Sequence, residues 1–339
     1  MRERDPQPAT RNPEHATRNP EPGTVITVGT FDGVHRGHRA ILDRLREKAT
    51  ALGLPSVLVT FEPHPLEIVR PESAPKLLTT PAEKLEALAQ VGLDRVVILR
   101  FDRRLAAYDP RRFVEDILLE RLGMCHLVTG YDHGFGRNRS GDAALLAQIG
   151  AEVGFGVDVV DPVLLDGEPI SSSRVRDALG RGDVVAAARG LARPYTLSGT
   201  VIRGAGRGRQ LGFPTANIAL PDTRKLLPAE GIYAVTAELD RGAGRGPHAT
   251  QSGLLHLGPR PTFADARPTI ELFAFDVDRD LYGETVRITF CAHIRPIERF
   301  ASETDLVRAM EADRVAAEHV FATGGGACAE VTRSLQSMV

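Results

Sequence analysis

Short apolar runs alternate with amphipathic segments through the first half of the chain. The runs are rich in Val, Ile and Leu and cover residues 24–29, 56–61, 95–100, 125–130 and 156–160. Apolar residues at helical spacing follow His35 and recur over residues 81–91, 111–122 and 141–153. Strands that are apolar on both faces and separated by helices indicate a parallel sheet with helices on both sides. We therefore predict an α/β Rossmann-like domain, whose ligands would bind at the carboxyl ends of the strands.

The pattern changes after about residue 187. Strands punctuated by Gly and Pro follow at residues 195–202, 231–239, 269–277 and 285–294. They predict a small antiparallel β-barrel. A helix over about residues 302–322 would close it, because Ser302 and Asp305 stand in capping-box positions. The Gly-rich insert at 241–252 is expected to form a hairpin loop.

The 339 residues are enough for two domains, with an extension at each end. Residues 1–22 contain a Pro-rich repeat of seven residues with almost no large apolar side chains, which predicts a disordered extension. The α/β domain is assigned to residues 23–185, and the barrel with its helix to residues 186–323. Residues 324–339 form a tail without a readable pattern.

Composition and charge narrow the functional class. The formal net charge is −2, so neither nucleic acid nor a membrane surface is expected as the main partner. No apolar run approaches the roughly 18 residues of a membrane helix, and the N-terminus lacks an apolar signal region, which predicts a cytosolic protein. Cys125, Cys291 and Cys328 are odd in number and far apart. We expect buried free thiols rather than disulfides or a zinc site.

A glycine- and histidine-rich motif, GTFDGVHRGH, joins the first strand to the first helix at residues 29–38. Its glycines would let the backbone approach a ligand closely, and the helix N-terminus offers unpaired N–H groups to a phosphate. His35 and His38 would face that phosphate and stabilise the charge that builds on it as pyrophosphate leaves. A histidine pair without a function at the start of a helix and a metal-binding pair are the alternatives.

A second polar cluster, ISSSRVRDAL at residues 170–179, follows the fifth strand and begins another helix. Three serine hydroxyls, with Arg174 and Arg176, would form a clamp for the β- and γ-phosphates of ATP. An ordinary helix cap with solvated arginines is the alternative. Both clusters lie at the same edge of the predicted sheet, which favours a shared site.

The second half contains a Gly- and Arg-rich segment, VIRGAGRGRQLGFPTANI. Neither a Walker A sequence nor a GxGxxG motif occurs in the chain, which argues against a P-loop kinase or a dinucleotide-binding enzyme. Gly204 and the glycines after it would let the loop fold over phosphates, with positive charge from two arginines. Thr215 and Asn217 alternate in an extended segment, so their oxygens can point to one side, as a magnesium site requires. A solvated loop is the alternative.

Glu271 lies in the predicted strand TIELFAF, on the same face as Phe273 and Phe275. A carboxylate among aromatic side chains is costly unless it is paired or takes part in chemistry. A glutamate on an edge strand that faces water is the alternative. Glu271 is therefore a candidate catalytic carboxylate.

These motifs resemble a known family. The histidine motif resembles the signature of the nucleotidyltransferase superfamily. Together with TFEPHP, GYDHGFGRNRSGD and ISSSRVR, it resembles the FAD synthetase module of bacterial bifunctional riboflavin kinase/FAD synthetases. The resemblance implies an ATP site for adenylyl transfer at Gly29, Phe31, Gly33, His35, His38, Ser171, Ser172, Ser173, Arg174 and Arg176. It implies an FMN site at His64, Asp132 and Phe135. His133 and Gly134 precede Phe135, where the family commonly has Asp or Asn followed by Phe.

The segment that ends in FPTAN resembles the riboflavin kinase signature, and DLYG and HIRPIERF extend the resemblance towards the C-terminus. It implies that riboflavin is phosphorylated to FMN, with Glu271 as the general base for its 5′-hydroxyl. The implied ATP residues of this kinase are Gly204, Arg207, Arg209, Phe213, Thr215 and Asn217, and Thr215 and Asn217 would also hold Mg²⁺. His256 stands where the family commonly has Asn.

The resemblance covers about residues 24–322. It predicts a bifunctional enzyme that converts riboflavin to FMN and FMN to FAD, with ATP and Mg²⁺ in both steps. The expected partners are the small molecules riboflavin, FMN, FAD and ATP. A relative with a single active site and a flavin sensor without turnover are the competing functions. The presence of both sets of motifs in one chain argues against each.

Overall fold

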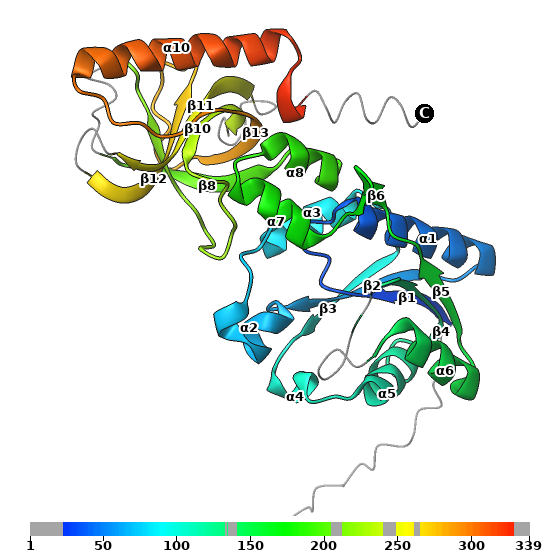
Figure 1. The fold of residues 1–339 in the computed structure, drawn as a ribbon. Coiled ribbons are helices and arrows are strands. Elements are labelled where there is room, and N and C mark those ends of the chain that lie inside the picture. Colours follow the sequence, from blue (N-terminus) through cyan, green and yellow to red (C-terminus); the bar gives the residue numbers. More distant parts are fainter. Residues whose placement is uncertain are drawn as a thin grey trace, which may run out of the picture.

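The structure is a computed structural model that describes residues 23–132, 134, 141–204, 212–239, 249–260 and 265–328. The expected N-terminal extension lies outside these ranges, as do most of the C-terminal tail and most of the predicted hairpin loop at 241–252. Among the helices that are described, none combines the length and the hydropathy needed to cross a membrane. The fold consists of an α/β half and a barrel half (Figure 1).

The α/β half is built on a five-stranded parallel sheet (Figure 1). Its strands are β1 (Thr24–Val28), β2 (Ser56–Glu62), β3 (Arg95–Arg100), β4 (Met124–Gly130) and β5 (Gly156–Val160), in the order β3-β2-β1-β4-β5. The five predicted strands are confirmed. The chain runs from β1 to β3 on one side of the sheet and from β4 to β5 on the other, so the strand order reverses beside β1. Ligands of open α/β sheets bind in the crevice at such a reversal.

Helices pack on both faces of this sheet. Helices α1 (Arg36–Leu52) and α3 (Pro81–Ala89) cover one face, whereas α5 (Pro110–Phe113), the π-helical η2 (Val114–Leu119) and α6 (Ala143–Val153) cover the other. The shorter elements are α2 (Pro65–Val69), η1 (Pro71–Ser73) and α4 (Arg103–Ala106). Val25 and Ile26, adjacent in β1, belong to the two different cores. This explains why the strand is apolar at both parities.

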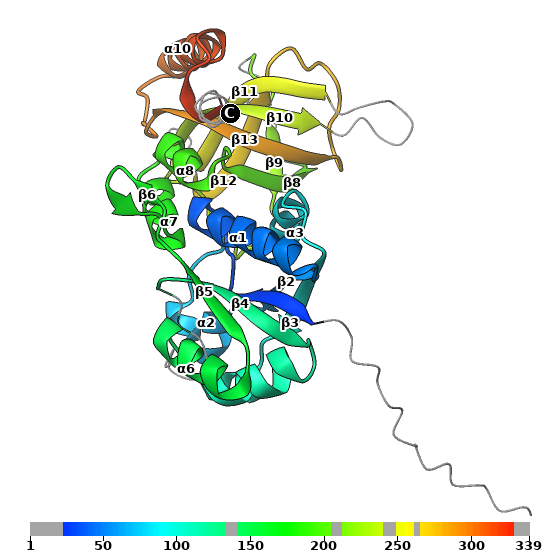
Figure 2. The same ribbon diagram turned by 90° about the vertical axis from the view of Figure 1, so that its right-hand side faces the viewer.

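The barrel half is a closed antiparallel barrel over the residues described. Its strands are β8 (Thr196–Ile202), β9 (Ala216–Ala219), β10 (Gly231–Leu239), β11 (Ala249–Arg260), β12 (Asp265–Ala274) and β13 (Thr285–Arg295), in the order β10-β11-β12-β9-β8-β13. Helix α10 (Glu303–Ala322) lies across the outside of the barrel (Figure 2). Ser302 caps it by accepting a hydrogen bond from the Asp305 N–H, as predicted.

The prediction missed strand β11. It begins at Ala249, so residues 249–252 form a strand and not part of a loop, which corrects the expected extent of the insert. Gly253, Gly258 and Pro259 interrupt the apolar alternation in this strand. The two glycines lie where the barrel has no room for a side chain: an added Cβ would be 2.4 Å from the Phe273 carbonyl oxygen at Gly253 and 2.5 Å from Ile297 Cδ1 at Gly258.

Helices α7 (Ser172–Gly180) and α8 (Val184–Leu191) lie between the two halves, after the short hairpin of β6 (Leu164–Leu165) and β7 (Glu168–Pro169) (Figure 1). Their buried side chains, among them Val175 and Leu179, join the core inside the barrel, and Leu78 of the α/β half joins the same core. The expected boundary between residues 185 and 186 falls within α8. As a division between independent folding units, it stays a prediction.

The expectation of three free thiols is wrong for two of them. Cys291 in β13 is bonded to Cys328, which follows α10, and their Cα atoms are 5.1 Å apart. Cys125 is free. The two bonded cysteines are 37 positions apart in the sequence. They meet because the chain returns to the barrel after α10. The distance between them in the sequence does not predict this contact.

Candidate active sites

The first candidate site begins with the turn between β1 and α1. His35 is the N-cap of α1, and its Nδ1 accepts a hydrogen bond from the His38 N–H at 3.3 Å. The two imidazole rings stack with their centroids 3.6 Å apart. A Cβ at Gly29 would lie 2.9 Å from the ring of Phe31, so glycine leaves room for that ring. Gly33 has a φ of +82°, which glycine adopts without steric cost. The predicted loop residues therefore come together at the carboxyl end of the central strand.

Both histidines are uncharged at neutral pH. Burial, opposed by the charge of Asp32 and assisted by that of Arg176, lowers the pKa of His35 to about 4. Burial and the neighbouring His35 hold the pKa of His38 well below its usual range. Because Nδ1 of His35 accepts a hydrogen bond, the ring proton is on Nε2. The ring can therefore donate a hydrogen bond to an anion without carrying a net charge.

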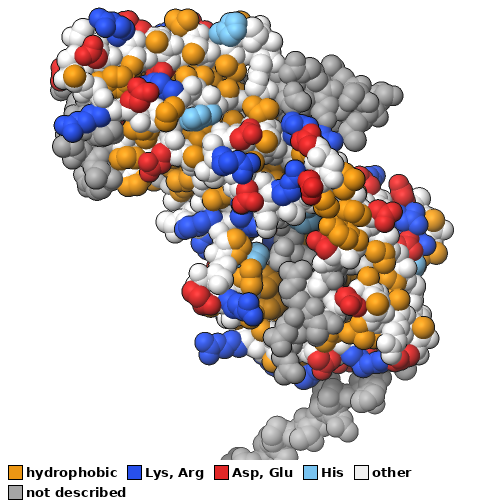
Figure 3. Space-filling view, viewed as in Figure 1, with side chains coloured by type: hydrophobic (Ala, Val, Ile, Leu, Met, Phe, Trp, Pro, Cys, Tyr) orange, Lys and Arg blue, Asp and Glu red, His pale blue; other side chains and the backbone are white. Residues whose placement is uncertain are grey.

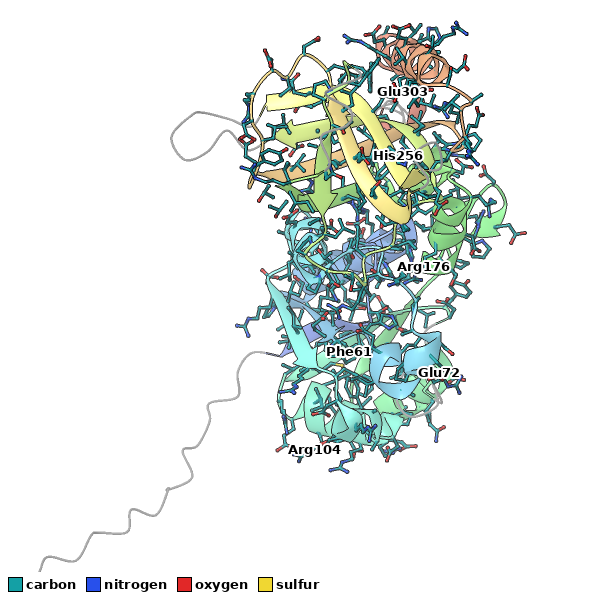
Figure 4. All side chains as sticks on the ribbon, turned by 90° about the vertical axis from the view of Figure 1, so that its left-hand side faces the viewer. Phe61, Glu72, Arg104, Arg176, His256 and Glu303 are labelled. Carbon is teal, nitrogen blue, oxygen red and sulfur yellow. A yellow bond between two sulfur atoms is a disulfide. The ribbon has the colours of Figure 1, made fainter. Side chains whose placement is uncertain are left out.

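The N-terminus of α7 packs directly on this loop. The hydroxyl of Ser172 donates to the carbonyl oxygen of Asp32 at 3.0 Å, and Arg176 Nη2 lies 2.5 Å from Asp32 Oδ2. The Asp32 carboxylate also accepts hydrogen bonds from the backbone N–H groups of Leu78 and Thr79, each at 3.0 Å. The two clusters that the sequence predicted at one sheet edge are thus in contact. Figure 4 shows Arg176 between the sheet and the barrel.

The other residues of the second cluster lie differently. Ser171 is the N-cap of α7 and accepts a hydrogen bond from the Arg174 N–H, while Ser173 is exposed. The Arg174 guanidinium donates to the carbonyl oxygens of Leu165, Glu168 and Pro169, at 2.7 to 3.2 Å. Arg174 thus holds the β6–β7 hairpin, and Arg176 is the arginine that reaches the histidine loop.

Three further residues, Lys84, Asp32 and Arg193, were not predicted from the sequence. The Lys84 ammonium lies 3.2 Å from Thr60 Oγ1 and 3.3 Å from the Phe61 carbonyl oxygen, at the carboxyl end of β2. Burial lowers its pKa. Arg193 donates to the carbonyl oxygen of Gly33 at 2.8 Å. The sequence contained one sign of a special role for Lys84. It lies three, four and seven residues before Ala87, Leu88 and Val91, so it is a charged residue on the buried face of a helical pattern.

Two of the three predicted FMN residues are described. His64 is the N-cap of α2, where its Nδ1 accepts from the Leu66 N–H at 3.2 Å. Burial lowers the pKa of His64, and the charges of Asp32 and Arg176 also act on it. Asp132 is exposed just beyond β4. Phe135 lies outside the described residues.

The second candidate site lies on the outer face of the barrel. Asn217 of β9, Glu271 of β12 and His256 of β11 are direct neighbours across three adjacent strands. The carboxylate of Glu271 accepts hydrogen bonds from Thr215 at 3.2 Å and from Thr269 at 3.0 Å. Because β12 has a hydrogen-bonded strand on each side, Glu271 is not on an edge strand. The predicted parity also holds, since Leu272 belongs to the inner core while Phe273 belongs to the core under α10.

The residues around Glu271 have different roles in the fold. A Cβ at Gly204 would lie 2.0 Å from Asn217 Nδ2, so a larger residue at this position would displace the Asn217 amide. Phe213 is buried and meets the Phe273 ring edge to face at 5.3 Å. Nε2 of His256 lies 3.0 Å from the carbonyl oxygen of Pro259, so it carries the ring proton. Arg207 and Arg209 lie outside the described residues.

Charges of both signs surround these sites. On the face drawn in Figure 3, Lys and Arg side chains are interspersed with Asp and Glu where the barrel meets the α/β half. Among the described residues, no group of three or more His, Cys, Asp and Glu side chains is arranged to hold a metal ion. The oxygens gathered at Thr215, Asn217 and Glu271 are instead a hydroxyl, an amide and a carboxylate. Such hard donors suit Mg²⁺ when substrate phosphates supply further ligands.

Comparison with known proteins connects the two sites. The FAD synthetase family model matches residues 17–174, and the riboflavin kinase family model matches residues 191–321. The chain is 40% identical over 299 residues to the bifunctional riboflavin kinase/FMN adenylyltransferase of Escherichia coli K12, covering 88% of this chain and 93% of the relative. The chain belongs to the bifunctional riboflavin kinase/FMN adenylyltransferase family.

Other members of this family are similar over the same length. The relative from Pseudomonas fluorescens is 41% identical over 301 residues, and the relative from Bacillus subtilis is 32% identical over 302 residues. They cover 88% of this chain, and 94% and 92% of their own lengths. A crystal structure from Streptococcus pneumoniae, described as a macrolide-efflux protein, superposes with a TM-score of 0.78 at 30% identity. It covers 88% of this chain and 94% of its own.

The family assigns an activity to each half. The protein phosphorylates riboflavin to FMN and adenylylates FMN to FAD, and ATP is the co-substrate of both reactions. The α/β half is the adenylyltransferase half, and the barrel with α10 is the kinase half. The family and the two activities that the sequence motifs implied are confirmed.

Proposed function

We propose that Glu271 is the general base of the kinase reaction. It takes the proton of the riboflavin 5′-hydroxyl as that oxygen attacks the γ-phosphorus of ATP, and ADP leaves. The observation that carries this proposal is the placement of Glu271 between Asn217 and His256, with Thr215 bonded to its carboxylate. A base must be held in one orientation, and two threonine hydroxyls hold this carboxylate.

Mg²⁺ would be held by Thr215 and Asn217 together with the phosphates of ATP. When bound, it would neutralise charge on the β- and γ-phosphates. Gly204, Arg207, Arg209 and Phe213 complete the proposed nucleotide site. Within this group, Phe213 acts by supporting Phe273 beneath the site, because its ring is buried in the core under α10.

In the adenylyltransferase half, a phosphate oxygen of FMN attacks the α-phosphorus of ATP, and pyrophosphate leaves. His35 and His38 donate hydrogen bonds to the phosphate oxygens on which charge accumulates. Gly29, Phe31 and Gly33 shape the loop that holds the nucleotide. The cluster from Ser171 to Arg176 binds the leaving phosphates, with Arg176 closest to the histidine loop. FMN binds at His64, Asp132 and Phe135.

The proposed setting of this chemistry is the cytoplasm, with small molecules as the only substrates. The formal net charge of −2 supports small molecules as the substrates, because proteins that bind nucleic acids or anionic membranes usually have an excess of basic residues. The interspersed charges on the face shown in Figure 3 agree with it.

The test uses a pair of variants with opposite expected effects. Glu271→Gln should lower riboflavin phosphorylation by roughly 100- to 10,000-fold, because the amide cannot accept the proton. FAD formation from added FMN should continue unchanged. His38→Ala should lower the rate of FAD formation by roughly 100- to 1,000-fold, so that FMN accumulates.

Chromatography of the flavins after incubation with Mg-ATP measures both reactions. Glu238→Gln and His319→Ala are matched controls, since both residues are exposed, one on the barrel and the other on α10. A Glu271→Gln protein that makes FMN within a few-fold of the wild-type rate would refute the assignment of the base. Unchanged FAD formation by His38→Ala would refute the role of the histidine loop.

A further inference from the structure

Arg224 belongs to the kinase half but binds carboxylates of the adenylyltransferase half. It lies between β9 and β10, and its Nη1 is 3.2 Å from Glu62 Oε1 and 3.1 Å from Glu67 Oε2. Glu62 ends strand β2, and Glu67 is in α2. In the sequence, Glu62 and Glu67 flank His64, the proposed FMN residue.

The position of Arg224 is fixed independently of these two carboxylates. Asp222 accepts hydrogen bonds from Nε, Nη2 and the backbone N–H of Arg224, at 2.7 to 3.0 Å. The carbonyl oxygen of Arg224 accepts from the Leu77 N–H at 2.8 Å. The next residue, Lys225, binds Glu83 of α3. The guanidinium therefore reaches its partners from a segment that is already attached to the adenylyltransferase half.

Glu67 transmits this position to His64. Oε1 of Glu67 accepts a hydrogen bond from the His64 N–H at 3.0 Å, and the His64 ring accepts one from Leu66 through Nδ1. Because Nδ1 already accepts a hydrogen bond, the ring proton is on Nε2, which can donate a hydrogen bond to a ligand.

Helix α2 depends on polar contacts for its position. It has five residues, and none of them is buried. A helix of this length is not stable by itself. Because none of its side chains is buried, packing against the core does not fix its position. The capping box of His64 and Glu67 forms its first turn, and Arg224 attaches that turn to the rest of the protein.

We propose that Arg224 is the positioning residue for the flavin side of the adenylyltransferase site: from the kinase half it holds Glu67, and through Glu67 it orients His64 toward FMN. This inference rests on the proposed binding of FMN at His64. Arg224 also offsets the negative charge of Glu62, Glu67 and Asp222 beside a substrate that carries a phosphate. Its removal would therefore both loosen His64 and repel FMN.

The experiment measures FAD formation by the full chain at saturating ATP. Arg224→Met should raise KM for FMN by about 10-fold, the order expected for losing a hydrogen bond to a charged group, and leave kcat within about three-fold. KM for ATP and riboflavin phosphorylation should stay within about two-fold. Arg224→Lys keeps the charge but not the planar fork, so it should recover part of the loss. Arg279→Met, which breaks a surface pair with Glu284 in the kinase half, is the matched control and should change nothing.

Two further variants test whether Arg224 acts through Glu67. They also distinguish an error in the proposed FMN site from an error in the role of Arg224. Glu67→Gln should raise KM for FMN, and adding Arg224→Met to it should raise KM by clearly less than the product of the single effects. If the increase in KM for the double variant equals the product of the two single increases, Arg224 does not act through Glu67. If His64→Ala leaves KM for FMN unchanged, the proposed FMN site is wrong and the inference falls with it. If His64→Ala raises KM and Arg224→Met does not, the inference alone is wrong. An equal decline of both activities in Arg224→Met would also overturn it, because it would indicate general loss of structure.

Discussion

The ion pair between Lys225 and Glu83 allows a quantitative test of how the two halves are joined. The Lys225 ammonium lies 2.6 Å from Glu83 Oε2 and 2.7 Å from the Leu78 carbonyl oxygen. The two side chains are only 3% and 5% exposed, and the ammonium also lies 4.3 Å from the centroid of the Tyr195 ring. Lys225→Met keeps most of the length and volume of the side chain and removes its charge. It leaves the Glu83 carboxylate buried, with the Thr80 N–H as its remaining described partner.

Removing one member of a buried pair costs about 3 to 5 kcal/mol, because the remaining charge has lost both water and its counterion. We expect Lys225→Met to lower the free energy of unfolding by this amount at pH 7. The double variant Lys225→Met with Glu83→Gln should recover most of it, since no buried charge remains. Glutamine at position 83 can still cap α3 as glutamate does.

For the single variant Glu83→Gln, the direction in which the free energy of unfolding changes with pH can also be predicted. Burial, opposed by Glu83, already lowers the pKa of Lys225. Without Glu83 the pKa falls further, so the folded protein holds fewer protons than the unfolded chain between that pKa and about 10.4. The stability of Glu83→Gln relative to wild type should therefore rise as the pH increases from 7 to 10.

Urea denaturation followed by circular dichroism measures these differences, with Arg314→Met as the control. Arg314 forms an exposed pair with Glu318, and its loss should cost less than about 1 kcal/mol. An unfolding free energy of Lys225→Met within about 1 kcal/mol of wild type would contradict this prediction. A double variant whose loss of stability equals the sum of the two single losses would also contradict it.

Two further predictions concern His35 and the cysteines. Because burial lowers the pKa of His35 to about 4 from 6.5, the wild type should lose about 3 kcal/mol more stability than His35→Asn as the pH falls from 7 to 4; parallel stability curves would contradict this. Asparagine preserves the N-cap. Titration of thiols in the denatured, unreduced protein should find the single free thiol of Cys125, and three thiols after reduction. Three thiols before reduction would contradict the Cys291–Cys328 bond.

Features that depend on neighbouring residues in the chain could be predicted from the sequence. The five parallel strands are apolar at both parities because helices cover both faces of the sheet, and this leaves continuous runs of Val, Ile and Leu. The Ser302 cap could be predicted because its partner is three residues away. The alternation of residues along the strand predicted that Glu271 lies on the same face of β12 as Phe273, opposite to Leu272. The motifs of both sites were recognised for the same reason, since each is a continuous segment.

Only the tertiary structure decided which separate segments meet. An apolar stripe shows that a face is buried but not what covers it, so the sequence did not show that the apolar face of α8 joins the barrel core. The same limit hid the bond between Cys291 and Cys328, and strand β11, whose glycines and proline break the local alternation. It also hid the use of Arg174 on the β6–β7 hairpin and of Arg224 on Glu67. A charged side chain takes the partner that the fold brings within reach, and no local spacing records that partner.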